Sequence, residues 1–256
     1  MSATKIIFLI LPHVHLLDLA GPDQVFLEAK DHGVDIEVEY CSVESLVLTS
    51  SHLEISRLQM FKKVKANKGD YIFIPGAEVD FLVSENFPQE KEISKWLREA
   101  YAKGAYLCSV CTGAFLLARL GLLNAKKCTT HWKRTAELKA RYPLVNLMQD
   151  ILFTEDEGLF TSAGVTAGID MALYVVERLK DSNVSFRVAR ELVVYMRRQG
   201  GEMQQTVFLN YRNHIHSSIH EVQDFIQDNI QQRLSLTALA HLACMSARNL
   251  TRVFKK

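Results

Sequence analysis

The stretch Ala105-Tyr-Leu-Cys-Ser-Val-Cys-Thr-Gly-Ala-Phe-Leu-Leu-Ala118 decides the fold of this chain. Residues 105–110 form an apolar run, typical of a strand that is buried on both faces of a sheet, and a helical pattern begins at Thr112. Cys111 lies at the junction, and the small residues Gly113 and Ala114 follow it, as a sharp strand-to-helix turn requires. The sequence therefore predicts a strand, a tight turn that carries a cysteine, and a helix.

Similar apolar runs recur upstream of this stretch and alternate with amphipathic segments. The runs predicted as strands are 5–11, 36–43, 71–74 and 105–110. The segments predicted as helices are 23–32, which we expect to begin near Pro22, and 89–103, which ends before a glycine. Alternating strands and helices indicate an α/β fold with a doubly wound, mostly parallel sheet.

The strict alternation ends downstream of residue 146. The sequence there predicts a hairpin, with arms at 147–154 and 159–162 and a turn at 155–158. Two helices are expected next, over 166–180 and 185–198. Gly200 and Gly201 then interrupt the pattern, so we place the end of the first domain at residue 201.

Composition limits the class of protein but does not indicate what the protein binds. The chain has 256 residues, enough for one large and one small domain, and its 30 basic and 29 acidic side chains leave net charge uninformative about nucleic acid. Five irregularly spaced cysteines do not form a disulfide framework, which fits a reducing cytoplasm. The short N-terminal apolar run fits a core strand rather than a signal peptide, and no membrane span is expected.

Cys111 is the first candidate for chemistry. Its position places a thiol at a helix N-terminus, where free N–H groups favour the thiolate and can stabilise an oxyanion. Two other interpretations remain open: a redox or metal dithiol formed with Cys108, and a cysteine that is merely packed in the core. Against the dithiol, Cys108 falls inside a predicted buried strand and no second cysteine pair exists. We expect no metal and no cofactor.

Several motifs around Cys111 resemble one known family. They are Leu17-Asp-Leu-Ala-Gly-Pro22, Val110-Cys-Thr-Gly-Ala-Phe115, Leu120-Gly-Leu-Leu123, Thr129-Thr-His-Trp132 and Thr161-Ser-Ala-Gly-Val-Thr-Ala-Gly-Ile-Asp170. Together they are similar to the PfpI-like branch of the class I glutamine-amidotransferase superfamily, and among its members to the GlxA-like regulators and the isocyanide hydratases. The resemblance covers about residues 5–201 and implies a flavodoxin-like sheet with a cysteine on the elbow.

The resemblance also assigns roles to individual residues. It implies that Cys111 is a nucleophile or sensor, that Asp18 hydrogen-bonds this cysteine and shares its proton, and that His131 lies near the pocket as a base. It further implies that the backbone N–H groups of Ala77 and Thr112 line an anion site.

Each of these roles has a competing interpretation. Relatives often have Pro-Gly-Gly where this chain has Pro75-Gly76-Ala77. The Ala77 side chain narrows the approach to the oxyanion hole, so we do not expect efficient turnover. Asp18 is equally suited to cap a helix that begins near Pro22, and His131 to a structural hydrogen bond. An enzyme is therefore the secondary interpretation.

The C-terminal part of the sequence predicts a small helical domain. Residues 202–216 are polar and weakly periodic, as in a linker, and helices are expected over 217–232, 236–245 and 247–256. Ser235 and Ser246 precede the last two helices as N-caps. The residues expected to form the small core are Leu242, Met245, Leu250 and Phe254. This pattern indicates a helix-turn-helix whose third helix enters the major groove.

The segment 246–256 has four basic side chains and no acidic one. We expect Arg248, Thr251 and Arg252 to reach base edges, and Lys255 and Lys256 to contact phosphates. A solvated basic face is the competing interpretation.

Residues 236–256 resemble the first helix-turn-helix of AraC-type regulators, which carry a second such motif beyond the last residue of this sequence. The expected domains are thus a sensor domain at 1–201, a linker at 202–216, and an incomplete half of a DNA-binding domain at 217–256. We predict a cytoplasmic transcription regulator that binds DNA, takes a small-molecule effector near Cys111 and forms a homodimer through its first domain. The alternative is a cysteine-dependent hydrolase or isocyanide-hydratase-like enzyme that uses Cys111 and Asp18.

Overall fold

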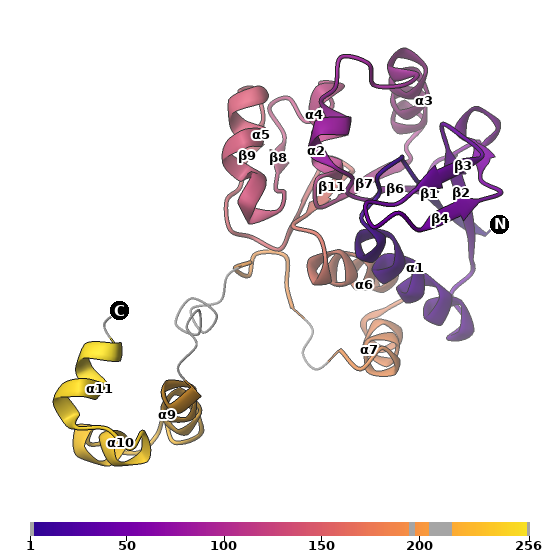
Figure 1. Cartoon of the computed structure of the whole chain (residues 1–256). Coiled ribbons are helices and arrows are strands. Elements are labelled where there is room, and N and C mark those ends of the chain that lie inside the picture. The colour runs from indigo at the N-terminus through magenta and orange to yellow at the C-terminus, as the bar shows by residue number, and fades with distance from the viewer. Residues whose placement is uncertain (1–2, 195–197, 205–216, 255–256) are drawn as a thin grey trace. The chain divides into compact units, whose positions relative to one another are not determined.

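The computed structural model describes residues 3–194, 198–204 and 217–254. The chain divides into two compact units, residues 1–204 and 205–256, which are described separately below (Figure 1). No helix within the described ranges is long and apolar enough to cross a bilayer.

The first unit is built on a seven-stranded sheet with the strand order β10-β11-β7-β6-β1-β2-β5. The strands are β1 (Thr4–Leu9), β2 (Ile36–Ser42), β5 (Gln59–Met60), β6 (Tyr71–Ile74), β7 (Tyr106–Val110), β10 (Phe153–Asp156) and β11 (Leu159–Ser162). Only the pairing of β10 with β11 is antiparallel, and the other five pairings are parallel. The doubly wound, mostly parallel sheet predicted from the sequence is therefore confirmed. A hairpin is also present where it was predicted, but its first arm is Phe153–Asp156 and not 147–154.

The central strands are apolar throughout because both of their faces are buried. Ile7 and Leu9 of β1 pack into the hydrophobic cluster on one face of the sheet, whereas Ile6 and Phe8 pack into the cluster on the other. All four side chains are fully buried. This explains why the sequence shows continuous apolar runs rather than alternation.

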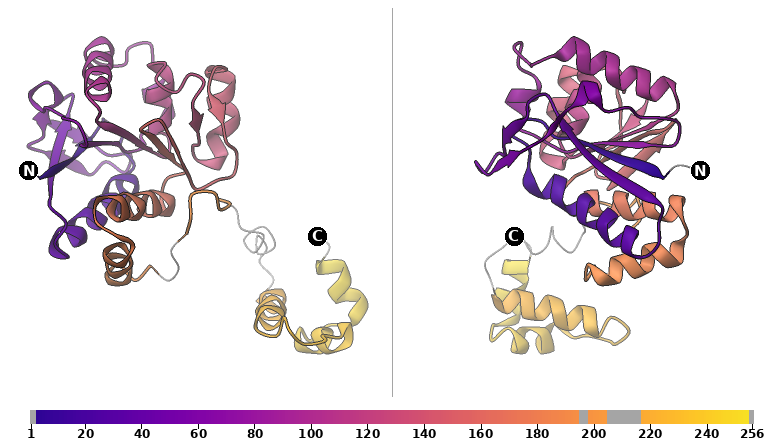
Figure 2. Two further views of the ribbon diagram at one scale, coloured as in Figure 1. Left: turned by 180° about the vertical axis from the view of Figure 1, so that it is seen from behind. Right: turned by 90° about the vertical axis from the view of Figure 1, so that its right-hand side faces the viewer.

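Helices cover both faces of the sheet (Figures 1 and 2). One face carries α1 (Leu16–Asp31), α6 (Thr166–Leu179) and α7 (Ser182–Glu191). The other carries α2 (Val79–Leu82), α3 (Glu90–Ala102), α4 (Gly113–Arg119) and α5 (Thr135–Arg141). Shorter elements complete the unit: β3 (Leu46–Leu48) with β4 (Glu54–Ser56), β8 (Lys127–Cys128) with β9 (Asn146–Leu147), and the 3-10 turns η1 (Phe61–Lys63) and η2 (Trp132–Arg134).

Helix α1 begins earlier than the sequence predicts. It starts at Leu16, and Pro22 lies inside it instead of at its first turn. The close packing of α1 on α6 accompanies this shift, since a Cβ on Gly21 would come within 2.9 Å of Ile169. Tertiary packing thus outweighs the preference of proline for a helix start.

The helix expected over 185–198 is also displaced. Helix α7 begins at Ser182 because the Asp181 carboxylate accepts the Val184 N–H at 2.8 Å and caps it. It ends at Glu191, and Val193 follows with a φ of +54°.

Residues 202–204, which we expected to begin the linker, hydrogen-bond the first unit through Glu202 and Gln204. Residues 205–216 of the expected linker lie outside the described residues.

The second unit contains α9 (Ser217–Asp228), α10 (Leu236–Leu242) and α11 (Ala247–Phe254). The Ser235 hydroxyl accepts the Ala238 N–H, and the Ser246 hydroxyl accepts the Asn249 N–H, each at 3.2 Å, so both N-caps are confirmed. Two of the four predicted core residues are confirmed, because Leu250 is buried and Met245 packs against the cluster around it. Leu242 and Phe254 are exposed instead, and the rest of the buried cluster comes from α9, α10 and the residue that follows α10, namely Ile219, Val222, Ala240 and Ala243.

Candidate functional site

Cys111 lies on a strained turn between β7 and α4. Its φ is +57°, in the left-handed region that residues with a Cβ seldom adopt. The next turn of chain passes so close to β6 that a Cβ on Gly113 would lie 2.2 Å from the Ile74 carbonyl oxygen. The tight turn with an obligatory small residue, predicted from the sequence, is confirmed.

Two further glycines make room around the cysteine. A Cβ on Gly164, whose φ is +86°, would lie 2.2 Å from the Cys111 Cβ. A Cβ on Gly76 would lie 2.5 Å from an Asp18 carboxylate oxygen. The chain after β6 and the chain after β11 can therefore approach Cys111 only because neither residue has a side chain.

Asp18 is buried and joins segments that are far apart in sequence. Its Oδ1 accepts the Val165 N–H at 2.7 Å, and its Oδ2 lies 3.3 Å from His15 Nδ1. The carboxylate also hydrogen-bonds the Cys111 thiol. Asp18 does not cap a helix near Pro22, because α1 already begins at Leu16.

The thiol of Cys111 is held in its protonated form. Burial raises its pKa well above the usual value, and the adjacent Asp18 carboxylate raises it further by repulsion and by accepting the thiol hydrogen. Hydrogen bonds from Thr112 act in the opposite direction but do not prevail. The thiolate expected from the helix N-terminus alone is thus disfavoured while Asp18 is ionised.

The anion site expected from Ala77 and Thr112 is only partly formed. The Ala77 N–H donates to Thr112 Oγ1 at 3.0 Å, and this hydroxyl donates to the Ala77 carbonyl at 2.6 Å. The Ala77 amide is therefore engaged and does not point at an anion. The Thr112 amide faces the Cys111 sulfur, as the hydrogen bond between them shows.

A cavity of about 270 Å³ opens over Cys111. Its lining residues are His15, Leu17, Asp18, Cys111, Thr112, His131, Lys133, Arg134 and Val165. A smaller cavity of about 160 Å³ shares His15, Thr112 and Arg134 with it and extends toward Glu78 and Asp80. Two cationic side chains and a cysteine in one cavity suit a small ligand that carries a negative or polar group.

His131 lines the cavity and also has a structural role. Its Nδ1 accepts the Lys133 N–H at 3.3 Å, which caps η2, and its ring stacks on Trp132. Burial, together with Lys133, lowers the pKa of His131, so its imidazole is neutral at pH 7.

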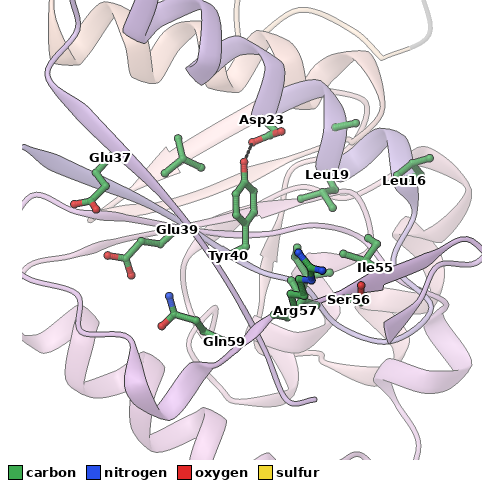
Figure 3. A pocket seen from close by; sticks show the side chains of 14 residues that line it. Leu16, Leu19, Asp23, Glu37, Glu39, Tyr40, Ile55, Ser56, Arg57 and Gln59 are labelled. Carbon is green, nitrogen blue, oxygen red and sulfur yellow. Dashed lines mark hydrogen bonds between the residues drawn. The ribbon is translucent and has the colours of Figure 1, made fainter. Parts of the chain in front are cut away.

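A second and larger cavity, of about 630 Å³, lies between α1, β2 and the chain from β4 to β5 (Figure 3). Within it the Tyr40 hydroxyl donates to the Asp23 carboxylate at 2.6 Å. Glu37, Glu39 and Arg57 also line it, but no cysteine or histidine does. Despite its size, it lacks the nucleophile and the tightly placed acid that distinguish the Cys111 cavity.

Several site residues escaped the sequence reasoning. His15, Gly76, Gly164 and Val165 all touch Asp18 or Cys111. One signal was present, because His15 precedes Asp18 by three residues, a spacing that places both side chains on one face of a helix. Val165 lies within the motif at 161–170, but the sequence did not show that its amide faces Asp18 or that it adopts a φ of +51°, which is unusual for a β-branched residue.

The predicted DNA-contacting residues lie on α11. Arg248 and Arg252 are exposed, and Arg252 also donates to Asn249 at 2.9 Å. Thr251 is half-buried, and its hydroxyl donates to the Ala247 carbonyl at 2.8 Å. Lys255 and Lys256 lie outside the described residues.

A mostly parallel α/β sheet that presents a cysteine on a strand-to-helix elbow, beside a buried carboxyl group, defines a class of cysteine-elbow proteins. Comparison with known families agrees with this class: the DJ-1/PfpI family pattern matches residues 4–178. This chain belongs to the DJ-1/PfpI family.

Two relatives with assigned names illustrate the range of the family. The HTH-type transcriptional regulator GbdR of Pseudomonas aeruginosa is 31% identical over 167 residues, which are 65% of this chain and 45% of GbdR. The isonitrile hydratase of Pseudomonas putida is 32% identical over 183 residues, which are 69% of this chain and 72% of the hydratase. The chain thus spans less than half the length of the regulator.

A solved structure supports the fold. An AraC family transcriptional regulator from Pseudomonas putida matches with a TM-score of 0.62 and 21% identity, covering 74% of this chain and 99% of the other.

Replacing Asp18 by Asn is expected to make Cys111 more reactive. Loss of the negative charge lowers the thiol pKa, and a decrease of one unit raises the thiolate fraction, and thus the alkylation rate near pH 8, about tenfold. The measurement is the pH dependence of iodoacetamide alkylation at Cys111, followed by mass spectrometry in a Cys244→Ser background. Asp23→Asn, in the same helix, is the matched control. An unchanged or upward-shifted pH profile for Asp18→Asn would show that Asp18 does not control the thiol.

Proposed function

We propose that this protein is a cytoplasmic, DNA-binding transcription regulator of the AraC type, in which the DJ-1/PfpI unit senses a small molecule at Cys111. The observation that carries the proposal is the presence, in one chain, of a ligand-sized cavity around a cysteine elbow and of a capped three-helix unit with a basic last helix. The names of relatives such as GbdR support the same function.

The DNA-binding part of the proposal rests on α11. Arg248 and Arg252 are four residues apart, so both project from one side of the helix, and both are exposed. The buried Leu250 anchors the opposite side to α9 and α10. A helix held in this way, with exposed guanidinium groups, suits the major groove, where arginine reads guanine.

Sensing requires a link between the Cys111 cavity and the chain that leads to the second unit. Arg198 supplies one link, because its Nη2 contacts Asp170 Oδ2 at 2.5 Å and Thr166 Oγ1 at 2.8 Å. Thr166 directly follows Val165, whose amide is bound by Asp18. A ligand that displaces the Asp18 carboxylate therefore disturbs the residue next to the Arg198 contact.

Gln204 supplies a second link. Its side-chain amide donates to the Thr130 carbonyl at 3.0 Å and to the Ile151 carbonyl at 2.9 Å. The Thr130 hydroxyl in turn donates to the Cys111 carbonyl at 2.8 Å. Gln204 and Arg198 thus bracket a segment whose contacts lead back to the cavity from two directions.

A homodimer through the first unit is part of the proposal. Large apolar side chains are exposed on α1 and on the β3–β4 hairpin, namely Leu16, Leu27, Leu46, Leu48 and Leu53. Helix α1 and β4 line one cavity together, so these exposed residues belong to neighbouring elements. Large exposed apolar side chains on neighbouring elements support an interaction surface in this part of the unit.

Substituting Arg248 or Arg252 by Ala is expected to weaken binding to the preferred duplex. Loss of a base contact reduces the binding free energy by about 1–3 kcal/mol. Loss of a phosphate contact reduces the slope of log affinity against log salt concentration by about one. The measurement is titration of the full chain with duplexes selected from a random library, at several stated salt concentrations. Arg187→Ala, an exposed arginine on α7, is the control. If both α11 variants bind as tightly as the parent chain, α11 is not the DNA-contacting helix.

Modification of Cys111 is expected to change DNA affinity only while the Arg198 link is intact. Carboxymethylation with iodoacetate, in the Cys244→Ser background, adds a carboxylate beside Asp18 and so stands in for an effector. We expect the modified and unmodified chains to differ in duplex affinity, and Arg198→Ala to abolish that difference, with Gln199→Ala as control. No difference in the parent chain, or a difference that survives Arg198→Ala, contradicts this coupling.

A cysteine-dependent enzyme is the second candidate. The observation in its favour is the hydrogen-bonded Cys111–Asp18 pair in a cavity, in a chain that aligns with most of an isonitrile hydratase. Against efficient turnover, the Ala77 amide is engaged by Thr112. The test is hydration of a small isonitrile. Activity that Cys111→Ser and Asp18→Asn both abolish supports an enzyme, whereas absence of activity in the parent chain excludes an isonitrile hydratase.

A further inference from the structure

Three different metal-binding side chains converge at the bottom of the Cys111 cavity. They are His15, Asp18 and Cys111, and one ligand atom from each lies within 4.8 Å of the other two. His15 Nδ1 and Asp18 Oδ2, the closest pair, are 3.3 Å apart. Two ligands bonded to one zinc ion at about 2.0–2.3 Å each are separated by little more than this distance, so only small shifts are needed to enclose an ion.

The donor set has the chemistry of a catalytic or sensory zinc site. An imidazole nitrogen, a carboxylate oxygen and a thiolate sulfur are the three ligand types that zinc takes from proteins. Three protein ligands leave the fourth tetrahedral position of a zinc ion open, and all three of these residues line the cavity. We propose that His15, Asp18 and Cys111 bind a divalent, thiophilic metal ion of the zinc type.

The surrounding structure already orients these ligands. His15 precedes α1, and its backbone N–H donates to the Gly76 carbonyl at 2.7 Å. Asp18 Oδ1 is occupied by the Val165 N–H at 2.7 Å, which leaves Oδ2 directed at His15. A ligand oxygen whose partner atom is fixed by a second hydrogen bond is the usual supporting arrangement around protein-bound metals.

Burial distinguishes this group from an ordinary cluster of surface acids. Asp18 is 1% exposed and Cys111 is 5% exposed, so a carboxylate and a metal-bound thiolate at these two positions have little access to water. On binding, the metal replaces the thiol proton, which passes to solvent, and the ion's two positive charges balance the thiolate and the carboxylate. Lys133 and Arg134 line the same cavity and favour water, hydroxide or an anionic ligand group at the open position.

This metal site is distinct from the proposed DNA contacts, and the two proposals are tested independently. Arg248 and Arg252 belong to the second unit, and none of the three ligands does. DNA binding can therefore fail its own test while metal binding succeeds, and the reverse also holds.

The test uses the metal-free full chain in a Cys244→Ser background, with Co²⁺ as the spectroscopic probe and Zn²⁺ as its competitor. We expect one equivalent of Co²⁺ to produce a sulfur-to-cobalt charge-transfer band, and Zn²⁺ to abolish it and to slow iodoacetamide alkylation of Cys111. Cys111→Ser removes the band. His15→Ala and the closer mimic His15→Gln weaken Co²⁺ binding about tenfold or more, the scale seen when metal-site residues are lost.

His131→Ala is the matched control, because His131 lines the same cavity but lies outside the three-ligand group. It should leave the Co²⁺ affinity unchanged. Absence of the charge-transfer band in the parent chain overturns the proposal. The proposal is also overturned if both His15 variants bind Co²⁺ with the affinity of the parent chain. It is overturned as well if His131→Ala weakens Co²⁺ binding while the His15 variants do not.

Discussion

The site depends on one buried carboxylate. Asp18 accepts the Val165 amide with one oxygen, faces His15 with the other and hydrogen-bonds the Cys111 thiol, so a single side chain joins α1, the start of α6 and the cysteine elbow. An ionised carboxylate away from water is costly unless it is hydrogen-bonded, and these partners offset that cost. The contacts are possible only because Gly76 and Gly164 have no Cβ.

The contacts of Asp18 control the reactivity of the Cys111 thiol. They are also the first step of the proposed link from the cavity to the rest of the chain. Burial and the neighbouring Asp18 carboxylate raise the pKa of the Cys111 thiol and so keep it protonated and unreactive. In the proposed sensor, a ligand or ion that engages the carboxylate alters the thiol and, through Val165 and Thr166, the contact that holds Arg198. A sensor built in this way needs no large movement of the sheet, because the response begins with one hydrogen bond.

The sheet and the elbow could be predicted because their signals are local. Strands buried on both faces must be apolar throughout, and a cysteine followed by Gly113 marks a turn too tight for a side chain. The start of α1, the engagement of the Ala77 amide and the protonated thiol could not be predicted in this way. They follow from contacts between distant segments, such as Asp18 with Val165 and Ala77 with Thr112, that no local pattern encodes. Leu242 and Phe254 were wrongly placed in the core of the small helical unit for the same reason, because that core depends on which face α9 presents.

Hydrogen exchange at the Val165 amide tests the central constraint most directly. This N–H has no partner within its own helix, and its protection depends on Asp18 Oδ1 alone. The account predicts slow exchange in the parent chain and loss of protection at Val165 in Asp18→Ala, while the amides of β1 and β7 remain protected. Exchange at Val165 as fast as at an exposed loop amide in the parent chain would contradict it.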